Sequence, residues 1–300
     1  MMLSMIISKQ RLIQTTMATT FALGSDAYGK ARTSVNALIS HQRSEGRPTA
    51  AIYLTINVNI KLAKSKDYRP RVIPLSHKLD KISNKTVLFI SKDPASHYRD
   101  ILTAKDSPTE DAFKEIISLK KLKLKSKSPK TLIKLYKEND IIVADNRVHK
   151  FLPDVLGTTF YARKKKVPFM LQMAKPDPSA KLRRTQQNKL KDDRCDAEYV
   201  YKQLKSIVGN TSFVPTINVG DVISLKIGYA NWVVDDLIEN INDIVKYLTN
   251  EENRAAIGAA INLENLVSVN VRGEGSISLP VSERSKETGQ KEDNDSDFDF

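Results

Sequence analysis

The chain has 300 residues, of which 40% are hydrophobic and 28% charged, and its formal net charge at pH 7 is +13. This composition is typical of a globular chain long enough for two domains, and it argues against a disordered or a membrane-spanning protein, since no apolar run approaches the ~20 residues that span a bilayer. The single cysteine, Cys195, excludes an intramolecular disulfide and a cysteine-rich zinc site, so we expect a reducing compartment.

The charge is unevenly distributed. Residues 283–300 hold seven acids against three bases, a net charge of −4, which leaves +17 on the rest of the chain. A body this basic attracts phosphate backbones or anionic membrane surfaces. We expect nucleic acid as the partner and no membrane association, with a merely basic surface as the alternative.

The N-terminal residues, 1–24, are expected to form a disordered leader. They contain Lys9 and Arg11, and no acid occurs before Asp26. A mitochondrial presequence is therefore an alternative, as is a true start of translation at Met17.

A helix and then a strand open the folded part of the chain. The helix is expected to begin with Ser25 as its cap, because apolar residues then recur at helical spacing from Tyr28 to Leu38. Apolar and polar residues alternate over 52–60, which indicates a strand with one buried and one solvated face.

The middle of the chain has a different pattern. Short continuous apolar runs predict strands at 86–90, 141–144 and 169–171. Helical stretches separate them, including one after Asp93-Pro94 and one over 113–122. Buried strands that alternate with helices indicate a parallel sheet covered on both faces.

The alternating pattern returns downstream, at 222–227 and 267–271. A strongly amphipathic helix is predicted between these strands over 234–248, with acids near its N-terminal end, as the helix dipole prefers. The change of strand type after Pro74 and its return after Pro178 suggest that one domain is inserted into another.

These patterns predict an α+β fold with an inserted α/β domain. Domain I is expected in two parts, 25–73 and 178–282, domain II over 74–177, and a disordered acidic tail over 283–300. Ser296 lies among acids, a context that acidophilic kinases favour, whereas an unmodified solubilising tail is the alternative.

Several short motifs follow one another in a specific order. They are Arg71-Val72-Ile73-Pro74-Leu75-Ser76-His77, Phe89-Ile90-Ser91-Lys92-Asp93-Pro94, Val143-Ala144-Asp145-Asn146-Arg147-Val148, Leu152-Pro153, Leu156-Gly157 and Ser278-Leu279-Pro280. Each motif alone is weak, whereas their order and spacing together are specific. Over roughly residues 25–281 the chain resembles the ribosomal protein L1 family, and within it the nucleolar branch.

The resemblance implies a split sheet-plus-helices domain I and a Rossmann-like, three-layer domain II, joined by a two-strand hinge. It implies binding of an rRNA precursor and contacts with other proteins of the pre-ribosomal particle, in the nucleolus and as part of the small-subunit processome. It implies no enzymatic activity and no cofactor. We expect a monomer within a large ribonucleoprotein.

Two departures from the ribosomal members matter. Residues 47–51 lack the Phe and the Glu that those members carry before the first strand. Near their C-terminal end those members carry a Ser/Thr-rich turn that contains Met-Gly, and Glu274 lies in the matching turn here. An acidic Glu274 repels phosphate, so these changes speak against the RNA site of the ribosomal members and favour an assembly factor. A ribosomal protein of the large-subunit stalk, cytosolic or mitochondrial, is the alternative. A protein-interaction module that has lost RNA binding is another.

Basic clusters and two further residues are the expected RNA contacts. The clusters contribute Lys120, Lys121, Lys123, Lys125, Lys127, Arg163, Lys164, Lys165, Lys166, Arg183 and Arg184. Arg272 and Ser276 match positions near the family's RNA-contacting turn. Several lysines together bind the phosphates of RNA, and such binding depends strongly on salt and little on the RNA sequence. A solvated face or a nuclear localisation signal is the alternative reading of these clusters. Since aromatic residues do not interleave with the clusters, we expect structured RNA rather than single strands.

Enzyme motifs are weak. Residues 24–30 have the spacing of a phosphate-binding loop, but Ala31 follows where Ser or Thr would hold magnesium. No G-x-G-x-x-G fingerprint occurs, and the four histidines lack metal-ligand spacing. We expect Asp145-Asn146-Arg147 to end a strand and cap the next helix. No catalytic residue and no metal site is predicted, and a nucleotide-dependent enzyme remains an alternative.

Overall fold

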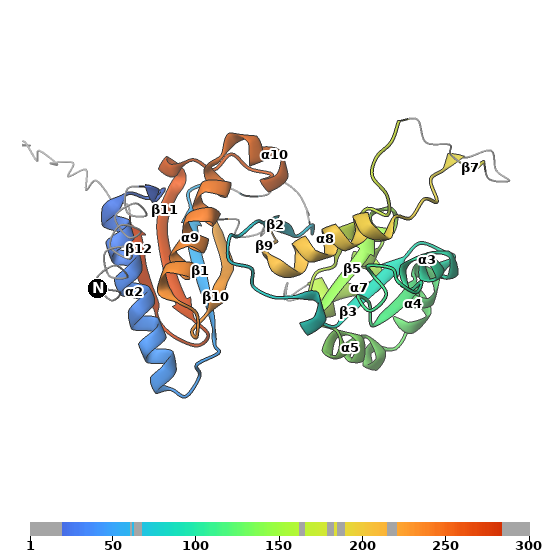
Figure 1. Cartoon of the computed structure of the whole chain (residues 1–300), viewed down its shortest axis with the longest axis horizontal. Coiled ribbons are helices and arrows are strands. Elements are labelled where there is room, and N and C mark those ends of the chain that lie inside the picture. Colours follow the sequence, from blue (N-terminus) through green and yellow to red (C-terminus); the bar gives the residue numbers. More distant parts are fainter. Residues whose placement is uncertain are drawn as a thin grey trace, which may run out of the picture.

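The computed structural model contains two domains, and the chain passes twice between them (Figure 1). It describes residues 20–60, 62, 68–161, 166–178, 183–184, 190–214 and 221–283. Most of the expected leader and nearly all of the acidic tail lie outside these residues. Phe21, which was expected in the leader, is buried, and its ring packs edge-on against Tyr28 with the centroids 5.8 Å apart. The packed part of domain I therefore begins before Ser25.

Domain I is an antiparallel sheet with helices on one face. Its elements are α2 (Ser25–Ser44), β1 (Ala51–Val58), β10 (Val222–Tyr229), α9 (Val234–Thr249), η2 (Glu251–Asn253), α10 (Arg254–Ile257), η3 (Leu263–Asn265), β11 (Leu266–Gly273) and β12 (Ser278–Glu283). The strand order is β10-β1-β11-β12, with every pair antiparallel. Figure 1 shows α2 and α9 together on this sheet, and both predicted downstream strands and the amphipathic helix are confirmed.

The alternation along β1 produces the two faces of this sheet. Ile52, Leu54 and Ile56 are fully buried and share one core with the apolar stripe of α9. Burying each such side chain contributes about 1.5–3 kcal/mol. Tyr53 and Asn57 lie on the opposite, polar face and are only half-buried. The strand prediction is thus confirmed, and the solvated face belongs to domain I.

The start of α2 differs from the prediction. Its N-cap is Gly24, and Ser25 is the first helical residue, with no side chain capping the end. Gly24 has a φ of +91° and its N–H donates to the carbonyl oxygen of Phe21 (2.9 Å). The tight turn requires a left-handed residue, which glycine adopts without strain. The expectation that Ser25 caps the helix is wrong.

Domain II is a parallel sheet covered on both faces. Its elements are η1 (Ile82–Asn84), β3 (Val87–Ser91), α3 (Ala95–Leu102), β4 (Glu115–Ser118), α4 (Leu119–Lys125), α5 (Pro129–Glu138), β5 (Ile141–Asp145), α6 (Asn146–His149), α7 (Leu152–Tyr161), β6 (Phe169–Leu171) and α8 (Ala197–Gly209). The order is β4-β3-β5-β6, all parallel. One core lies between the sheet and α3 and α8, and another between the sheet and α4, α5 and α7. This is the three-layer arrangement that was expected.

The helix predicted over 113–122 is wrong in its first half. Residues 115–118 form β4, and only then does α4 begin. Two apolar residues, Ile116 and Ile117, are too few to distinguish a strand from a helix by periodicity. The segment is a strand because it pairs with β3, where Ile90 lies opposite Ile117.

A short two-stranded sheet joins the domains. It consists of β2 (Arg71–Ile73) and β9 (Thr211–Phe213), which pair antiparallel, as the two-strand hinge implies. Helix α8 was expected in domain I, but Val200 and Leu204 are fully buried in a core with strand β3. We therefore propose that domain II extends to this hinge rather than ending at residue 177.

Candidate nucleic-acid interface

Helix α4 presents most of the first predicted basic cluster. It follows β4 directly, and the Ser118 side chain caps it by accepting from the Lys121 N–H (3.2 Å). Leu122 is fully buried and fixes the helix on the sheet. The residues around it are exposed, and they include Lys120, Lys121, Lys123 and Lys127. We call these four residues the α4 lysine cluster.

The α4 lysine cluster is not neutralised by neighbouring acids. Within the described part of the chain, no carboxylate lies within ion-pair distance of its four ammonium groups. Lys125 differs, because its ammonium pairs with Glu115 at 2.9 Å. A partly exposed pair of this kind contributes only about 0–1 kcal/mol, so a phosphate competes for Lys125 at low cost. The cluster is therefore suited to bind a polyanion.

The Lys166 side chain is directed to the C-terminal end of α5. Its ammonium donates to the carbonyl oxygens of Tyr136 (2.5 Å) and Asn139 (2.8 Å), at the C-terminal end of α5. It also lies over the Tyr136 ring, 4.5 Å from the centroid. A cation here satisfies free carbonyls and complements the helix dipole. We propose that Lys166 stabilises the end of α5 rather than contacting RNA.

The remaining basic residues predicted around domain II are only partly described. Arg163, Lys164 and Lys165 lie outside the described residues. Arg183 and Arg184 form the short strand β7 (Arg183–Arg184), which pairs antiparallel with β8 (Leu190–Lys191). Figure 1 shows β7 far from domain I, projecting from domain II. Their role in RNA binding stays a prediction.

A polar network closes the carboxyl end of the parallel sheet. Asp145, at the end of β5, caps α6 by accepting from the Arg147 N–H (2.9 Å). The Arg147 guanidinium bonds the same carboxylate, the Tyr98 hydroxyl (2.7 Å) and the carbonyl oxygen of Asp192. The expectation that Asp145 ends a strand and caps a helix is confirmed.

This network occupies the place where nucleotides bind in open α/β sheets, the switch point between β3 and β5. Lys92 pairs with Asp193 (3.4 Å), and the His97 ring bonds the Asp193 carbonyl (2.9 Å). Asp145 is thereby committed to Arg147 rather than free for chemistry. Among the described residues, no group of three or more His, Cys, Asp or Glu is placed to hold a metal ion.

The two residues predicted in domain I are placed differently. Arg272 lies on the polar face of the sheet, over the Tyr53 ring (5.5 Å), and donates to the Ser224 hydroxyl (3.3 Å). The Ser276 hydroxyl accepts from the Gly273 N–H (2.8 Å) and donates to the Ile277 carbonyl (3.2 Å). Ser276 thus holds its own turn, whereas Arg272 is available at the surface.

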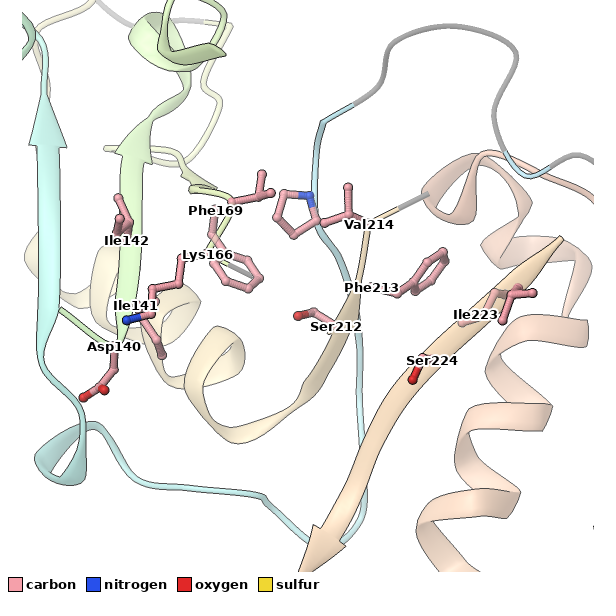
Figure 2. A pocket seen from close by; sticks show the side chains of 13 residues that line it. Asp140, Ile141, Ile142, Lys166, Phe169, Ser212, Phe213, Val214, Ile223 and Ser224 are labelled. Carbon is pink, nitrogen blue, oxygen red and sulfur yellow. The ribbon is translucent and has the colours of Figure 1, made fainter. Parts of the chain in front are cut away.

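A cavity of about 350 Å³ lies across the hinge (Figure 2). Domain II contributes Ile141, Lys166 and Phe169, and the other side holds Phe213 and Ile223. Figure 2 shows these side chains lining the space between the parallel sheet and β9 and β10. The residues come from five separate segments, so no local sequence signal indicates the cavity. It carries no cluster of free charges of the kind found on α4.

Phe151 is a surface residue that the sequence analysis missed. It lies between α6 and α7 and is 42% exposed. The ammonium of Lys123 is 5.8 Å and that of Lys150 4.9 Å from the centroid of its ring. No aromatic residue interleaves with the basic clusters in the sequence, and the fold brings Phe151 beside Lys123. The contact between Lys123 and Phe151 joins α4 to the segment between α6 and α7, and only the parallel sheet brings them together.

None of the described helices is both long and apolar enough to span a membrane. The profile of the Ribosomal protein L1p/L10e family matches residues 38–277. The ribosome biogenesis protein UTP30 of Saccharomyces cerevisiae is 40% identical over 232 residues, which are 77% of this chain and 80% of UTP30. Two proteins of Schizosaccharomyces pombe have names that assign them provisionally to ribosome biogenesis. One is 24% identical over 72% of this chain and 67% of its own length. The other is 26% identical over 66% of this chain and 45% of its own length. The chain therefore belongs to the Ribosomal protein L1p/L10e family.

Proposed function

We propose that this chain is a non-catalytic ribosome biogenesis factor that binds an rRNA precursor in the nucleolus. It acts as a monomer within a large ribonucleoprotein, as a component of the small-subunit processome. The similarity to UTP30, a protein named for ribosome biogenesis, extends over most of both chains and supports the role in assembly. The basic body, with a net charge of +13 for the whole chain, supports a polyanionic partner.

The observation that carries RNA binding is the α4 lysine cluster. Lys120, Lys121 and Lys123 lie on the short helix α4, and Lys127 follows just after its end. All four are exposed, without carboxylate partners in the described part of the chain. Each lysine that neutralises a phosphate releases a counterion, so binding is strong at low salt and weakens steeply as salt rises. Arg272 on the polar face of domain I adds a second contact.

The closed carboxyl end of the parallel sheet supports a non-catalytic role. The contacts of Arg147, Lys92 and His97 fill this end with the protein's own side chains. A nucleotide-dependent enzyme would need this network to open. We therefore assign domain II to binding rather than to chemistry.

In-cell crosslinking with sequencing of the bound RNA tests the proposal. We expect reads from the small-subunit precursor, including spacer sequence that is absent from mature rRNA. Recovery of mature large-subunit rRNA alone would contradict the assembly role and favour a stalk protein. Recovery of no RNA would favour a protein-interaction module.

A further inference from the structure

Phe151 lies beside the α4 lysine cluster with an unusual set of neighbours. Lys123 reaches its ring from α4, and Lys150 reaches it from the adjoining turn, at 5.8 and 4.9 Å from the centroid. Leu124, which is 60% exposed, is a second exposed apolar side chain, on α4. Helices α4 and α6 follow β4 and β5 directly at the same edge of the parallel sheet, which brings these residues together.

A single exposed phenylalanine is common and marks no site by itself. Two cations beside one exposed ring form a more specific arrangement. An exposed cation–π contact is weak, so the flexible lysines exchange the ring for phosphates at low cost. The ring of Phe151 then remains as a flat apolar platform with positive charge on its border.

We propose that Phe151 stacks on an unpaired base of the bound RNA while Lys123 and Lys150 contact the flanking phosphates. The inference rests on the proposed function and names the feature of the RNA that this surface selects. Stacking of a base on an aromatic side chain contributes about 1–3 kcal/mol, more than the cation–π contact that it replaces. Bases inside a duplex are not accessible to such a ring, so the surface selects a bulge or loop nucleotide next to a helix.

An acidic protein segment is the other occupant that this charge allows. Such a segment needs positive charge and apolar area, and a leucine in place of Phe151 would serve it equally. A nucleotide couples a planar base to a phosphate within one short unit, which matches a flat ring bordered by Lys123 and Lys150. The planar geometry therefore favours RNA.

The test measures binding of the full-length chain to two RNA hairpins with the same stem, one with a single bulged adenosine and one fully paired. The wild-type chain is expected to bind the bulged hairpin more tightly. Phe151→Ala is expected to lower affinity for the bulged hairpin about 5- to 150-fold, the loss of one base stack. Affinity for the paired hairpin, which rests on phosphate contacts, is expected to stay unchanged.

Conservative variants separate stacking from apolar contact. Phe151→Tyr keeps the ring and is expected to keep affinity for the bulged hairpin. Phe151→Leu keeps apolar volume and is expected to bind as weakly as Phe151→Ala. Ile133→Ala is the matched control, because Ile133 is 47% exposed on α5 of the same domain. It is expected to leave both affinities unchanged.

The outcomes distinguish this inference from the proposed function. If the wild-type chain binds both hairpins equally, or if Phe151→Leu binds like the wild type, stacking is wrong while RNA binding stands. If Phe151→Ala leaves both affinities unchanged, the surface serves a protein partner instead. If the wild-type chain binds neither hairpin at any salt concentration, the proposed function fails together with the stacking.

Discussion

The guanidinium of Arg147 bonds both oxygens of the Asp145 carboxylate, two residues earlier in the chain. Its Nε lies 2.9 Å from Oδ1 and 3.0 Å from Oδ2. The Asp145 side chain is only 2% exposed, so this carboxylate has little access to water. The pair therefore stabilises the carboxyl end of the parallel sheet, where β5 gives way to α6.

Breaking this ion pair from the cationic side is expected to destabilise the fold. Arg147→Met leaves a buried carboxylate without its partner, which costs about 3–5 kcal/mol of the free energy of unfolding. Urea denaturation measures the loss. The double variant Asp145→Asn with Arg147→Met is expected to recover much of it, because no charge is then left buried. A loss below about 1 kcal/mol in Arg147→Met would show that the carboxylate is solvated.

Charge reversal in the α4 lysine cluster is expected to weaken RNA binding and its salt dependence. Lys121 and Lys123 are both exposed, so the double change to Glu leaves the core intact. Losing two phosphate contacts lowers the slope of log K against log salt by about 1.4–1.8. A salt titration of affinity for a structured RNA measures both effects.

A matched control for this charge change lies on the other side of the sheet. Lys81 and Lys205 are exposed and line the groove between η1 and α8, on the face opposite α4. Changing both to Glu alters the net charge by the same amount. This variant is expected to keep most of the affinity and the slope. Equal losses in both variants would mean that only the overall charge of the chain attracts the RNA.

Lys166 is expected to act on stability and not on RNA binding. Lys166→Met removes a cation that donates to two carbonyl oxygens at the end of α5. Hydrogen bonds from a charged group contribute about 1.5–3 kcal/mol each to stability. At this half-buried site water can replace part of the lost hydrogen bonding, so the loss is smaller. We expect a lower urea midpoint together with unchanged RNA affinity. A loss of affinity without a loss of stability would return Lys166 to the RNA contacts.

The sequence predicts helices and strands well where the hydrophobic pattern is long and only one face of the element is buried. The alternation in β1 and the stripe of α9 are confirmed almost to their ends, because one buried face imposes a period on the chain. Strand β4 was missed, since its identity depends on pairing with β3 and not on its four residues. The domain to which α8 belongs was not predictable, because an amphipathic stripe does not say which sheet it covers.

For the candidate site, the sequence predicts which basic residues are present but not the contacts that they make. The lysine run at 120–127 is visible in the sequence, and its exposure on α4 follows from the buried Leu122. That Lys166 turns inward to α5 depends on a carbonyl group 27 residues away. That Phe151 meets Lys123 depends on two neighbouring connections of one parallel sheet, those that follow β4 and β5. Contacts of this kind arise from topology, and no local pattern records them.

The thiol of Cys195 is expected to be unreactive in the folded chain. Burial raises its pKa to about 11, so little thiolate is present at pH 8. Because the thiolate is the nucleophile, alkylation at pH 8 should be about two orders of magnitude slower than in the urea-unfolded chain. The native state also keeps a proton that the unfolded state releases, so this group lowers stability as pH rises from about 9 to about 11. Cys195→Ala is expected to lose that component of the pH dependence. Equal alkylation rates in the folded and unfolded chains would show that the segment before α8 opens readily.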